Sequence, residues 1–262
     1  MERDLEALRA LRTGQPRRRR RRRLVLLAMA TVVAATVVGI VALAVWLALL
    51  PGVGDAQARG AAIVRAHHSR AVHVPASARI ARAVVAVEDQ RFYSHHGIDS
   101  HSLLRVAWHT LSGGGDQGGA TIDQQLAKLL YTGDRHDLAG KLAQLGLALK
   151  LDHHYTKATL LDLYLNVTYW GDDQWGIANA SAGYFHKPPA GLDWGEASLL
   201  AGLLQAPFAY NPRSHLQSAQ RRQRHVLDRL VATGTLRRTQ ADAAYRELAR
   251  EATRWGFQTR AA

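Results

Sequence analysis

An adjacent acidic pair, Glu88 and Asp89, directly follows an apolar stretch within residues 83–99 (AVVAVEDQRFYSHHGID). A carboxylate among apolar residues loses hydration, which raises its pKa and suits it to general-base chemistry near neutral pH. The apolar residues before the pair recur at helical spacing, so a plainer interpretation is that Glu88 marks the polar end of a buried helix. Both interpretations stay open on these two residues alone.

The residues that follow the acidic pair favour a functional site. Phe92, His95, Gly97 and Asp99 bring an aromatic ring, an imidazole, a flexible turn and another acid into one short segment. Such a mixture is typical of loops that carry function, and it is unusual for a simple helix end. The segment therefore predicts a site in which a carboxylate acts as an acid or a base.

A second candidate region is rich in glycine. Gly113, Gly114 and Gly115, then Gly118 and Gly119, precede the sequence TIDQQLAKLL, which has a helical pattern. A flexible loop that leads into a helix N-terminus presents free backbone N–H groups, which suits a phosphate. The GK[ST] ending of a nucleotide-binding P-loop is missing. A mobile surface loop is the alternative interpretation.

Apolar residues at three-to-four spacing predict the elements that must position these residues. Helices are expected over 80–87, 103–111, 122–130, 138–151, 156–166, 177–185, 196–204 and 218–231. Period-two alternation is weak, and 71–74 and 167–169 are the only strand candidates. The fold class is therefore predicted to be mainly α.

The N-terminal region combines a basic block with a long apolar run. Seven consecutive arginines, Arg17 to Arg23, are followed by residues 24–50, which carry no charge. Twenty-seven helical residues exceed the roughly 30 Å hydrocarbon core of a bilayer, so this run predicts a transmembrane signal-anchor helix. The arginines predict that residues 1–23 form a basic cytoplasmic tail. A signal peptide cleaved near Ala56 is the less favoured alternative.

Composition and charge set outer bounds on the function. The chain has 262 residues and 47% apolar content, enough for one folded domain after the anchor. It lacks cysteine, which excludes disulfides and thiolate chemistry. Setting the seven arginines aside lowers the net charge from +13 to +6. We interpret this excess as suited to an anionic membrane or substrate, not to a nucleic-acid partner.

Four sequence blocks occur in this order along the chain: EDQRFYSHHG, GGATIDQQLAK, YLNVTYWGDDQWGIANASAGYFHK and EASLLAGLLQAPFAYNP. Together they resemble the peptidoglycan glycosyltransferases of family 51, over roughly residues 76–235. These enzymes occur alone, as monofunctional transglycosylases, or within bifunctional penicillin-binding proteins. No Ser-x-x-Lys transpeptidase motif follows Gly234, so the chain resembles the monofunctional form.

The resemblance implies one lysozyme-like α-helical glycosyltransferase domain, assigned here to residues 76–262, with residues 51–75 as a juxtamembrane stalk. It implies a single-pass protein of the bacterial plasma membrane with its catalytic domain on the outer face. The implied substrates are lipid II and the growing lipid-linked glycan chain, joined by inverting transfer with release of polyprenyl diphosphate. Other cell-wall synthesis proteins are candidate partners, and Mg²⁺ or another divalent cation is a candidate cofactor.

The resemblance also implies roles for individual residues. Glu88 matches the catalytic glutamate and is assigned as the general base, and Asp89, Phe92, His95 and Gly97 match the rest of that motif. A further set is assigned to the diphosphate and sugar, by matching motif positions or by nearness in sequence. It comprises Thr121, Gln124, Gln125, Lys128, Arg135, His136, Lys141 and Asp152.

Several positions depart from the family pattern. An Arg-Lys-x-x-Glu motif is usual where this chain has Gly140, Lys141 and Gln144, so the second active-site glutamate is a glutamine here. Ala120 replaces a serine, and His186 replaces a glycine. Losing one charge-stabilising contact typically costs about 10²- to 10³-fold in rate. An impaired lipid II-binding scaffold is therefore a second hypothesis, and a lysozyme-like hydrolase is a weaker third.

Overall fold

The computed structural model describes residues 2–102, 119–135 and 137–257. The helix expected over 103–111, the glycines at 113–115 and 118, and His136 lie outside the described residues. The chain divides into two compact units, Met1–Pro51 and Gly52–Ala262.

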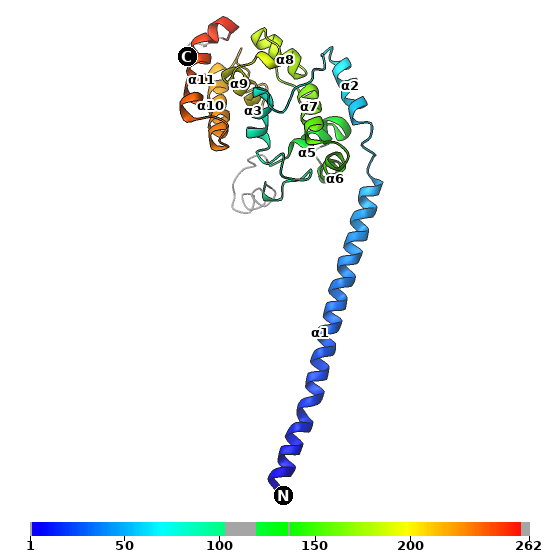
Figure 1. Ribbon diagram of the computed structural model, residues 1–262. Coiled ribbons are helices and arrows are strands. Elements are labelled where there is room, and N and C mark those ends of the chain that lie inside the picture. Colours follow the sequence, from blue (N-terminus) through cyan, green and yellow to red (C-terminus); the bar gives the residue numbers. More distant parts are fainter. Residues whose placement is uncertain (1, 103–118, 136, 258–262) are drawn as a thin grey trace. The chain divides into compact units, whose positions relative to one another are not determined.

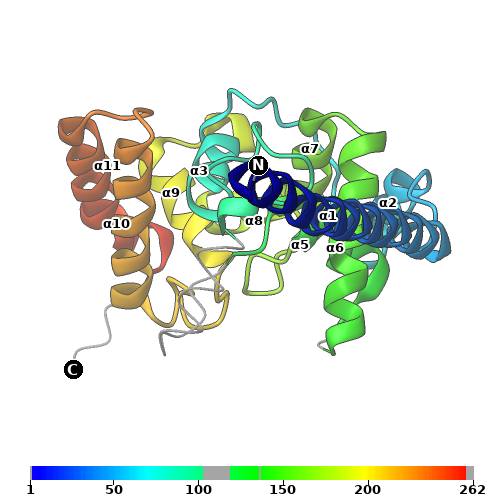
Figure 2. The same cartoon turned by 90° about the horizontal axis from the view of Figure 1, so that it is seen from below.

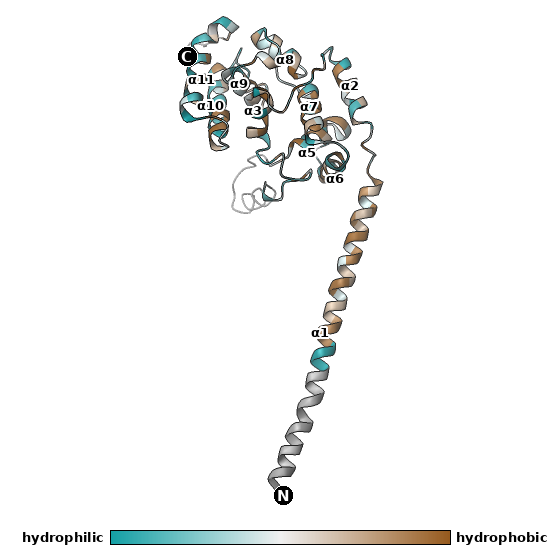
Figure 3. Cartoon of the chain, in the orientation of Figure 1, coloured by the Kyte–Doolittle hydropathy of each residue, from teal (hydrophilic) through white to brown (hydrophobic). Residues whose placement is uncertain are grey.

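The first unit is one long helix, α1 (Glu2–Leu49), shown in Figure 1. Its Arg20–Leu49 part is long and apolar enough to cross a membrane. The apolar side chains along it are mostly exposed, with Leu24 at 59% and Val38 at 67%, and Figure 3 shows this hydrophobic band beginning after the arginines. The helix is continuous through the arginines, so no break separates the expected tail from the expected span.

The second unit is helical throughout the residues described. Its helices are α2 (Ala56–Ala66), α3 (Arg79–Glu88), α5 (Ile122–Ala127), α6 (Leu138–His154), α7 (Lys157–Val167), α8 (Ile177–Phe185), α9 (Trp194–Leu203), α10 (Leu216–Ala232) and α11 (Arg238–Glu251). Shorter turns are the π-helical η1 (Lys128–Thr132) and the 3₁₀ turns η2 (Pro189–Gly191) and η3 (Ala252–Trp255).

The prediction of a mainly α fold is confirmed, and most predicted helices are found within a few residues of their expected ends. The strand candidates are wrong: in the described part of the chain, β-pairing is limited to isolated bridges such as Tyr169 with Trp175. The reason is that α7 continues to Val167, and the residues after it turn tightly. The segment expected as a stalk contains α2, which packs on α7.

The helices of the second unit form two groups that lie side by side in Figures 1 and 2. In one group α9 contacts α3, α10 and α11, and in the other α5 contacts α6 and α7. Residues 195–203 of α9 are all buried, as expected for a helix that is apolar on every side. The chain that leaves α3 runs between the groups, so its polar residues reach both.

The end of α3 explains how the acidic pair is presented. The helix buries Ile80, Val84 and small residues between them, and it ends at Glu88, after which Asp89 leaves the helical conformation. Gly97 then adopts a φ of +75°, and a Cβ on it would lie 2.6 Å from the carbonyl oxygen of Ala148 on α6. Only glycine fits this position, because it tolerates both the conformation and the close approach.

Candidate active site

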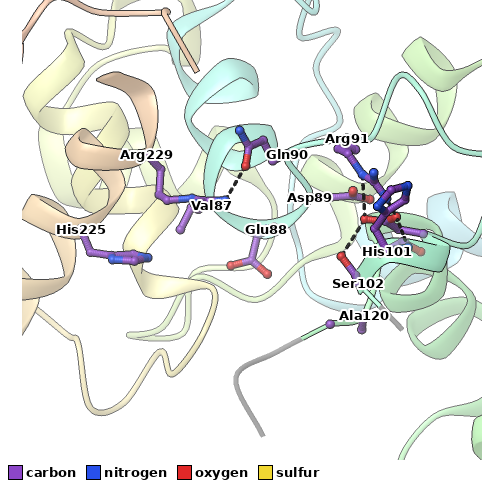
Figure 4. Close-up of a pocket in the computed structure, with 13 residues that line it drawn as sticks. Val87, Glu88, Asp89, Gln90, Arg91, His101, Ser102, Ala120, His225 and Arg229 are labelled. Carbon is purple, nitrogen blue, oxygen red and sulfur yellow. Dashed lines mark hydrogen bonds and ion pairs between the residues drawn. The ribbon is translucent and has the colours of Figure 1, made fainter. Parts of the chain in front are cut away.

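A cavity of about 390 Å³ lies at the C-terminal end of α3, as Figure 4 shows. Four segments contribute to its wall: the end of α3 with the turn after it, residues 99–102, the residues before α5, and α10. The lining residues are Val87, Glu88, Asp89, Gln90, Arg91, Asp99, His101, Ser102, Gly119, Ala120, Thr121, His225 and Arg229. Three of the predicted site residues, Glu88, Asp89 and Thr121, are among them.

Three largely buried acids line this cavity. Asp99 pairs with Arg91 and accepts a hydrogen bond from Ser102, and Asp89 pairs with His95. The third acid is Glu88. Its side chain is 12% exposed, and its carboxylate faces the cavity between α10 and Ala120 in Figure 4. Gln125 Nε2 donates to Oε2 at 2.9 Å, and Arg222 Nη2 lies 3.9 Å from Oε1. Burial raises the pKa of Glu88, while the bond from Gln125 and the charge of Arg222 lower it by less. The net result is a carboxylate with increased basicity.

A chain of hydrogen bonds holds the orientation of Glu88. The hydroxyl of Tyr164 on α7 donates to Gln125 Oε1 at 2.7 Å, which leaves the amide nitrogen of Gln125 to donate to Glu88. Both donor and acceptor of the amide are thereby used. Gln125, which was assigned to the diphosphate, is therefore placed by the structure as a partner of Glu88.

Asp89 points away from Glu88 and joins three segments. His95 Nε2 lies 2.9 Å and 3.0 Å from its two carboxylate oxygens, and the backbone N–H of Ile122 donates to Oδ2 at 3.0 Å. These bonds connect the end of α3, the following loop and the start of α5. Thr121 Oγ1 adds a bond of 2.7 Å to the carbonyl oxygen of Gly97. The motif residues thus fix the backbone that carries Glu88.

A second, deeper group of charges lies beyond His95. Lys157 Nζ is 2.7 Å from carboxylate oxygens of both Asp123 and Asp152, and it sits 4.5 Å from the centre of the Phe92 ring. Asp123 Oδ2 is also 3.8 Å from His95 Nδ1. We call Asp123, Asp152 and Lys157 the buried charge cluster. It holds Asp152, so this predicted substrate residue lies outside the cavity lining.

Burial dominates the electrostatics of that cluster. It raises the pKa of Asp123 to about 6, even though the hydrogen bond and charge of Lys157 lower it. The side chain of Asp123 is fully buried, and its Oδ1 atom has no hydrogen-bond partner in the part of the chain that the structure describes. Taking charges out of water costs several kcal/mol each, so the cluster depends on keeping its members paired.

Among the described residues, Asp89, His95 and Asp123 are the group that could hold a metal ion, because one ligand atom from each lies within 4.8 Å of the others. They do not fit a Mg²⁺ site. Mg²⁺ prefers several oxygen ligands and bound water. Here Lys157 already supplies a positive charge 2.7 Å from Asp123, and Asp89 already accepts from His95 and Ile122. We assign no metal step to these residues.

Thr121 and Gln124 form a capping box at the start of α5. The N–H of Gln124 donates to Thr121 Oγ1 at 3.2 Å, and the N–H of Thr121 donates to Gln124 Oε1 at 2.9 Å. The expectation that this helix start offers free N–H groups to a phosphate is wrong for Ile122 and Gln124, whose N–H groups have internal partners. Both predicted binding side chains serve as caps, which satisfies the helix end.

The remaining predicted cations and Gln144 lie outside the cavity lining. Lys128 begins η1 with a half-buried side chain, and Lys141 is exposed on α6. Arg135 Nη2 is 3.3 Å from Asp137, and Gln144 Nε2 donates to Thr132 Oγ1 at 3.1 Å. These residues gather around η1 and the start of α6, and the structure does not bring them to the wall beside Glu88. Their assignment to the diphosphate stays a prediction.

Two departures from the family pattern have local structural consequences. Gly140 is buried, and a Cβ on it would lie 2.7 Å from Asp137 Oδ1 and 2.8 Å from the Arg135 carbonyl oxygen. Asp137 caps α6 by accepting from the Gly140 N–H at 3.0 Å, so a larger side chain at position 140 would press on this tight turn. His186 ends α8 in the left-handed conformation, with a φ of 54°, where glycine is favoured.

Sequence reasoning missed the residues that α10 contributes. His225 and Arg229 line the cavity, and Arg222 lies beside Glu88. The three recur at positions i, i+3 and i+7, which places them on one face of a helix next to its apolar stripe. That spacing was a usable signal. Lys157 carried no comparable signal, because Asp123 lies 34 residues away in sequence, and the nearby Asp152 is not at an i+3 or i+4 spacing from it.

The described part of the chain thus combines a helical fold with a largely buried glutamate that faces a cavity. Comparison with known proteins identifies the family of this chain. Residues 60–231 match the family described as Transglycosylase, so the chain belongs to that family.

The chain is similar to several proteins of known name. It is 37% identical over 166 residues to penicillin-binding protein 1A of Neisseria flavescens, covering 63% of this chain and 21% of that protein. It is 37% identical over 165 residues to a Cupriavidus necator protein named as a transglycosylase, covering 63% of this chain and 71% of that protein. The chain therefore spans about a fifth of the penicillin-binding proteins 1A that it matches.

A crystal structure of penicillin-binding protein 1A from Haemophilus influenzae also matches. Its sequence identity is 29%, its TM-score is 0.34, and the match covers 48% of this chain and 15% of that one.

Proposed function

We propose that this chain is a membrane-anchored peptidoglycan glycosyltransferase that polymerises lipid II into β-1,4 glycan strands. The observation that carries the proposal is Glu88, a carboxylate that is 12% exposed, faces a cavity and has its pKa raised by burial. Membership of the transglycosylase family supports the same activity. The apolar Arg20–Leu49 helix supports an anchor, with the preceding arginines in the cytoplasm.

The proposed reaction is a single inverting displacement. Glu88 removes the proton from the 4-hydroxyl of an incoming lipid II sugar as that oxygen attacks the anomeric carbon of the growing chain. The new β-1,4 bond forms as the bond to the diphosphate oxygen breaks, and the electron pair leaves with the polyprenyl diphosphate. One base is sufficient, because this leaving group is already anionic and needs no proton.

The surrounding residues support the role of Glu88 as the base. Gln125 and Arg222 contact different oxygens of its carboxylate, so its orientation toward the cavity is held from two sides. A base must lie within hydrogen-bond reach of the proton that it takes, and a fixed carboxylate meets that need without reorganisation. Positive charge for the leaving group is proposed to come from Lys128, Arg135 and Lys141.

The test is polymerisation of labelled lipid II by the purified full-length protein in detergent. The wild type is expected to give glycan polymer, and Glu88→Gln is expected to lose about 10²- to 10⁴-fold in rate. Glu247→Gln, an exposed acid on α11, is the matched control and should retain full rate. Lipid II binding is measured in parallel, and it should be similar in all three proteins.

Other outcomes would point to other functions. If the wild type binds lipid II but forms no polymer, the chain is a scaffold and the proposal fails. Release of fragments from finished cell wall, lost in Glu88→Gln, would instead identify a hydrolase. Polymerisation that survives Glu88→Gln unchanged would assign the base to another residue.

A further inference from the structure

Among the described residues, Arg222 is the cationic side chain closest to the Glu88 carboxylate. Its Nη2 atom lies 3.9 Å from Glu88 Oε1, and the two side chains are only 13% and 12% exposed. Within the residues that the structure describes, Glu88 is its one carboxylate partner within 4.0 Å. A charge pair shielded from water interacts more strongly than a pair on the surface.

The packing of α9 against α10 makes room for this arginine. A Cβ on Gly202 of α9 would lie 3.0 Å from Arg222 Cγ, so the bare glycine provides the space through which the side chain passes. The stem of Arg222 is thus enclosed before its guanidinium reaches Glu88. The arginine Nε atom is buried and has no hydrogen-bond partner among the described residues. The guanidinium is therefore placed by packing, not by a network of its own.

The groups that face Glu88 differ in charge and in kind. From α10 comes Arg222, from α5 the neutral Gln125, and from α7 the neutral Tyr164 behind Gln125. The neighbouring Asp89 adds negative charge, although His95 pairs with it. His225 and Arg229 line the same cavity from α10, but Arg229 donates to Gln90 Oε1 at 2.6 Å. Arg222 is therefore the main charge that favours an ionised Glu88.

We propose that Arg222 is a positioning residue that keeps Glu88 ionised and oriented, so that the carboxylate is ready to accept a proton at neutral pH. This inference rests on the proposed function. Burial alone would favour the protonated acid, which cannot act as a base. Arg222 opposes this effect while leaving the cavity side of the carboxylate free, because it approaches at 3.9 Å from the helix side. A shorter, bidentate contact would instead occupy the oxygen that takes the proton.

The first experiment measures the pH profile of polymerisation for the full-length protein. Arg222→Met is expected to move the acidic limb of kcat/KM upward by about 1 pH unit, because an opposite charge at this distance typically lowers a carboxyl pKa by 1 or more. At pH values below that limb, the rate of Arg222→Met should be about tenfold lower than the wild-type rate. Arg222→Lys keeps a positive charge, so its acidic limb should lie close to the wild-type pH. Arg224→Met, which removes a surface partner of Asp242, is the matched control and should leave the profile unchanged.

A second readout does not depend on activity. Carbon-13 NMR of labelled glutamate, with the Glu88 signal assigned by its loss in Glu88→Gln, reports the titration of this carboxyl directly. The signal should titrate at higher pH in Arg222→Met and near the wild-type pH in Arg222→Lys. If the wild type forms no polymer but the signal still shifts, the proposed function fails and the electrostatic role of Arg222 stands.

The inference is overturned if the pH limb and the NMR titration of Arg222→Met match the wild type. A uniform loss of rate at every pH, together with a lower melting temperature, would show that Arg222 only packs. A rise in KM with an unchanged limb would show that it binds substrate.

Discussion

Glu88 and Asp123 are both desolvated carboxylates, and they lie on opposite sides of the same motif. Glu88 faces a cavity and has a cation at 3.9 Å, whereas Asp123 is fully buried with Lys157 at 2.7 Å. Burial raises the pKa of both groups. They differ in access: Glu88 lines the cavity, and the fully buried Asp123 does not.

This difference separates the acid that we propose as the base from an acid enclosed by the fold. A raised pKa by itself does not identify a catalytic group, because buried ion pairs perturb pKa values as well. Three features together distinguish Glu88 from Asp123: its carboxylate faces a cavity, its cationic partner is more distant, and its neighbours fix its orientation. Asp123 instead pairs with Lys157 and lies next to His95, which pairs with Asp89. Asp123 can therefore affect the site only indirectly, through the backbone that Asp89 and His95 hold in place.

The largest expected effect comes from exchanging the two acids for their amides. Glu88→Gln should lower the polymerisation rate about 10²- to 10⁴-fold with little change in melting temperature. Asp123→Asn should lower the melting temperature and retain most of the rate in the folded fraction. Rates and thermal unfolding measured on the same preparations check this. Equal loss of rate in both variants would remove the distinction.

The buried charge cluster should respond strongly to the loss of its cation. Lys157→Met leaves Asp123 and Asp152 without their shared partner, and breaking a buried pair typically costs about 3–5 kcal/mol. Arg238→Met, which removes an exposed pair with Asp228, is the control and should cost about 1 kcal/mol or less. Denaturant unfolding of the two variants measures both values. A cost for Lys157→Met no greater than the control would show that the cluster is not structural.

The pH dependence of stability should report Asp123. Because its pKa is raised to about 6 in the folded state, the folded protein binds more protons than the unfolded chain between about pH 4 and pH 6. This contribution is fully present below about pH 4 and is lost as the pH rises through about 6, amounting to at most about 3 kcal/mol. Unfolding free energies of the wild type relative to Asp123→Asn should show this decline. A flat difference across that range would contradict it.

The smallest expected effects concern the two family departures on α6. Gly140→Arg should cost about 1–3 kcal/mol, because its Cβ would press on Asp137 and the Arg135 backbone. Gln144→Glu should change stability by less than about 0.5 kcal/mol, since the hydroxyl of Thr132 can donate to the new carboxylate. Thermal unfolding distinguishes the two. A destabilising Gln144→Glu would mean that the amide nitrogen is required, and Gly140→Ala separates size from charge at the first position.

The local patterns of the chain determined its elements and its most informative residue. Apolar spacing located the helices, the arginines next to an uncharged run located the apolar span, and the motif around Glu88 located the candidate base. The helices and the apolar span were found as predicted, because helix formation and burial follow from neighbouring residues, while the role of Glu88 as the base stays a prediction. The weak strand candidates failed because short apolar runs resemble both strands and helix ends.

Tertiary packing decided what each polar residue contacts. Gln125 turned toward Glu88, and Thr121 and Gln124 capped a helix. Lys157 met Asp123, which is distant from it in sequence, as well as the nearby Asp152. Arg222 reached Glu88 across the α9–α10 contact through the space at Gly202. Spacing along a chain does not encode such distances, because they depend on how separate helices approach each other. The sequence thus predicted Glu88 as a candidate base, and only the tertiary structure decided that Gln125 and Arg222 contact it.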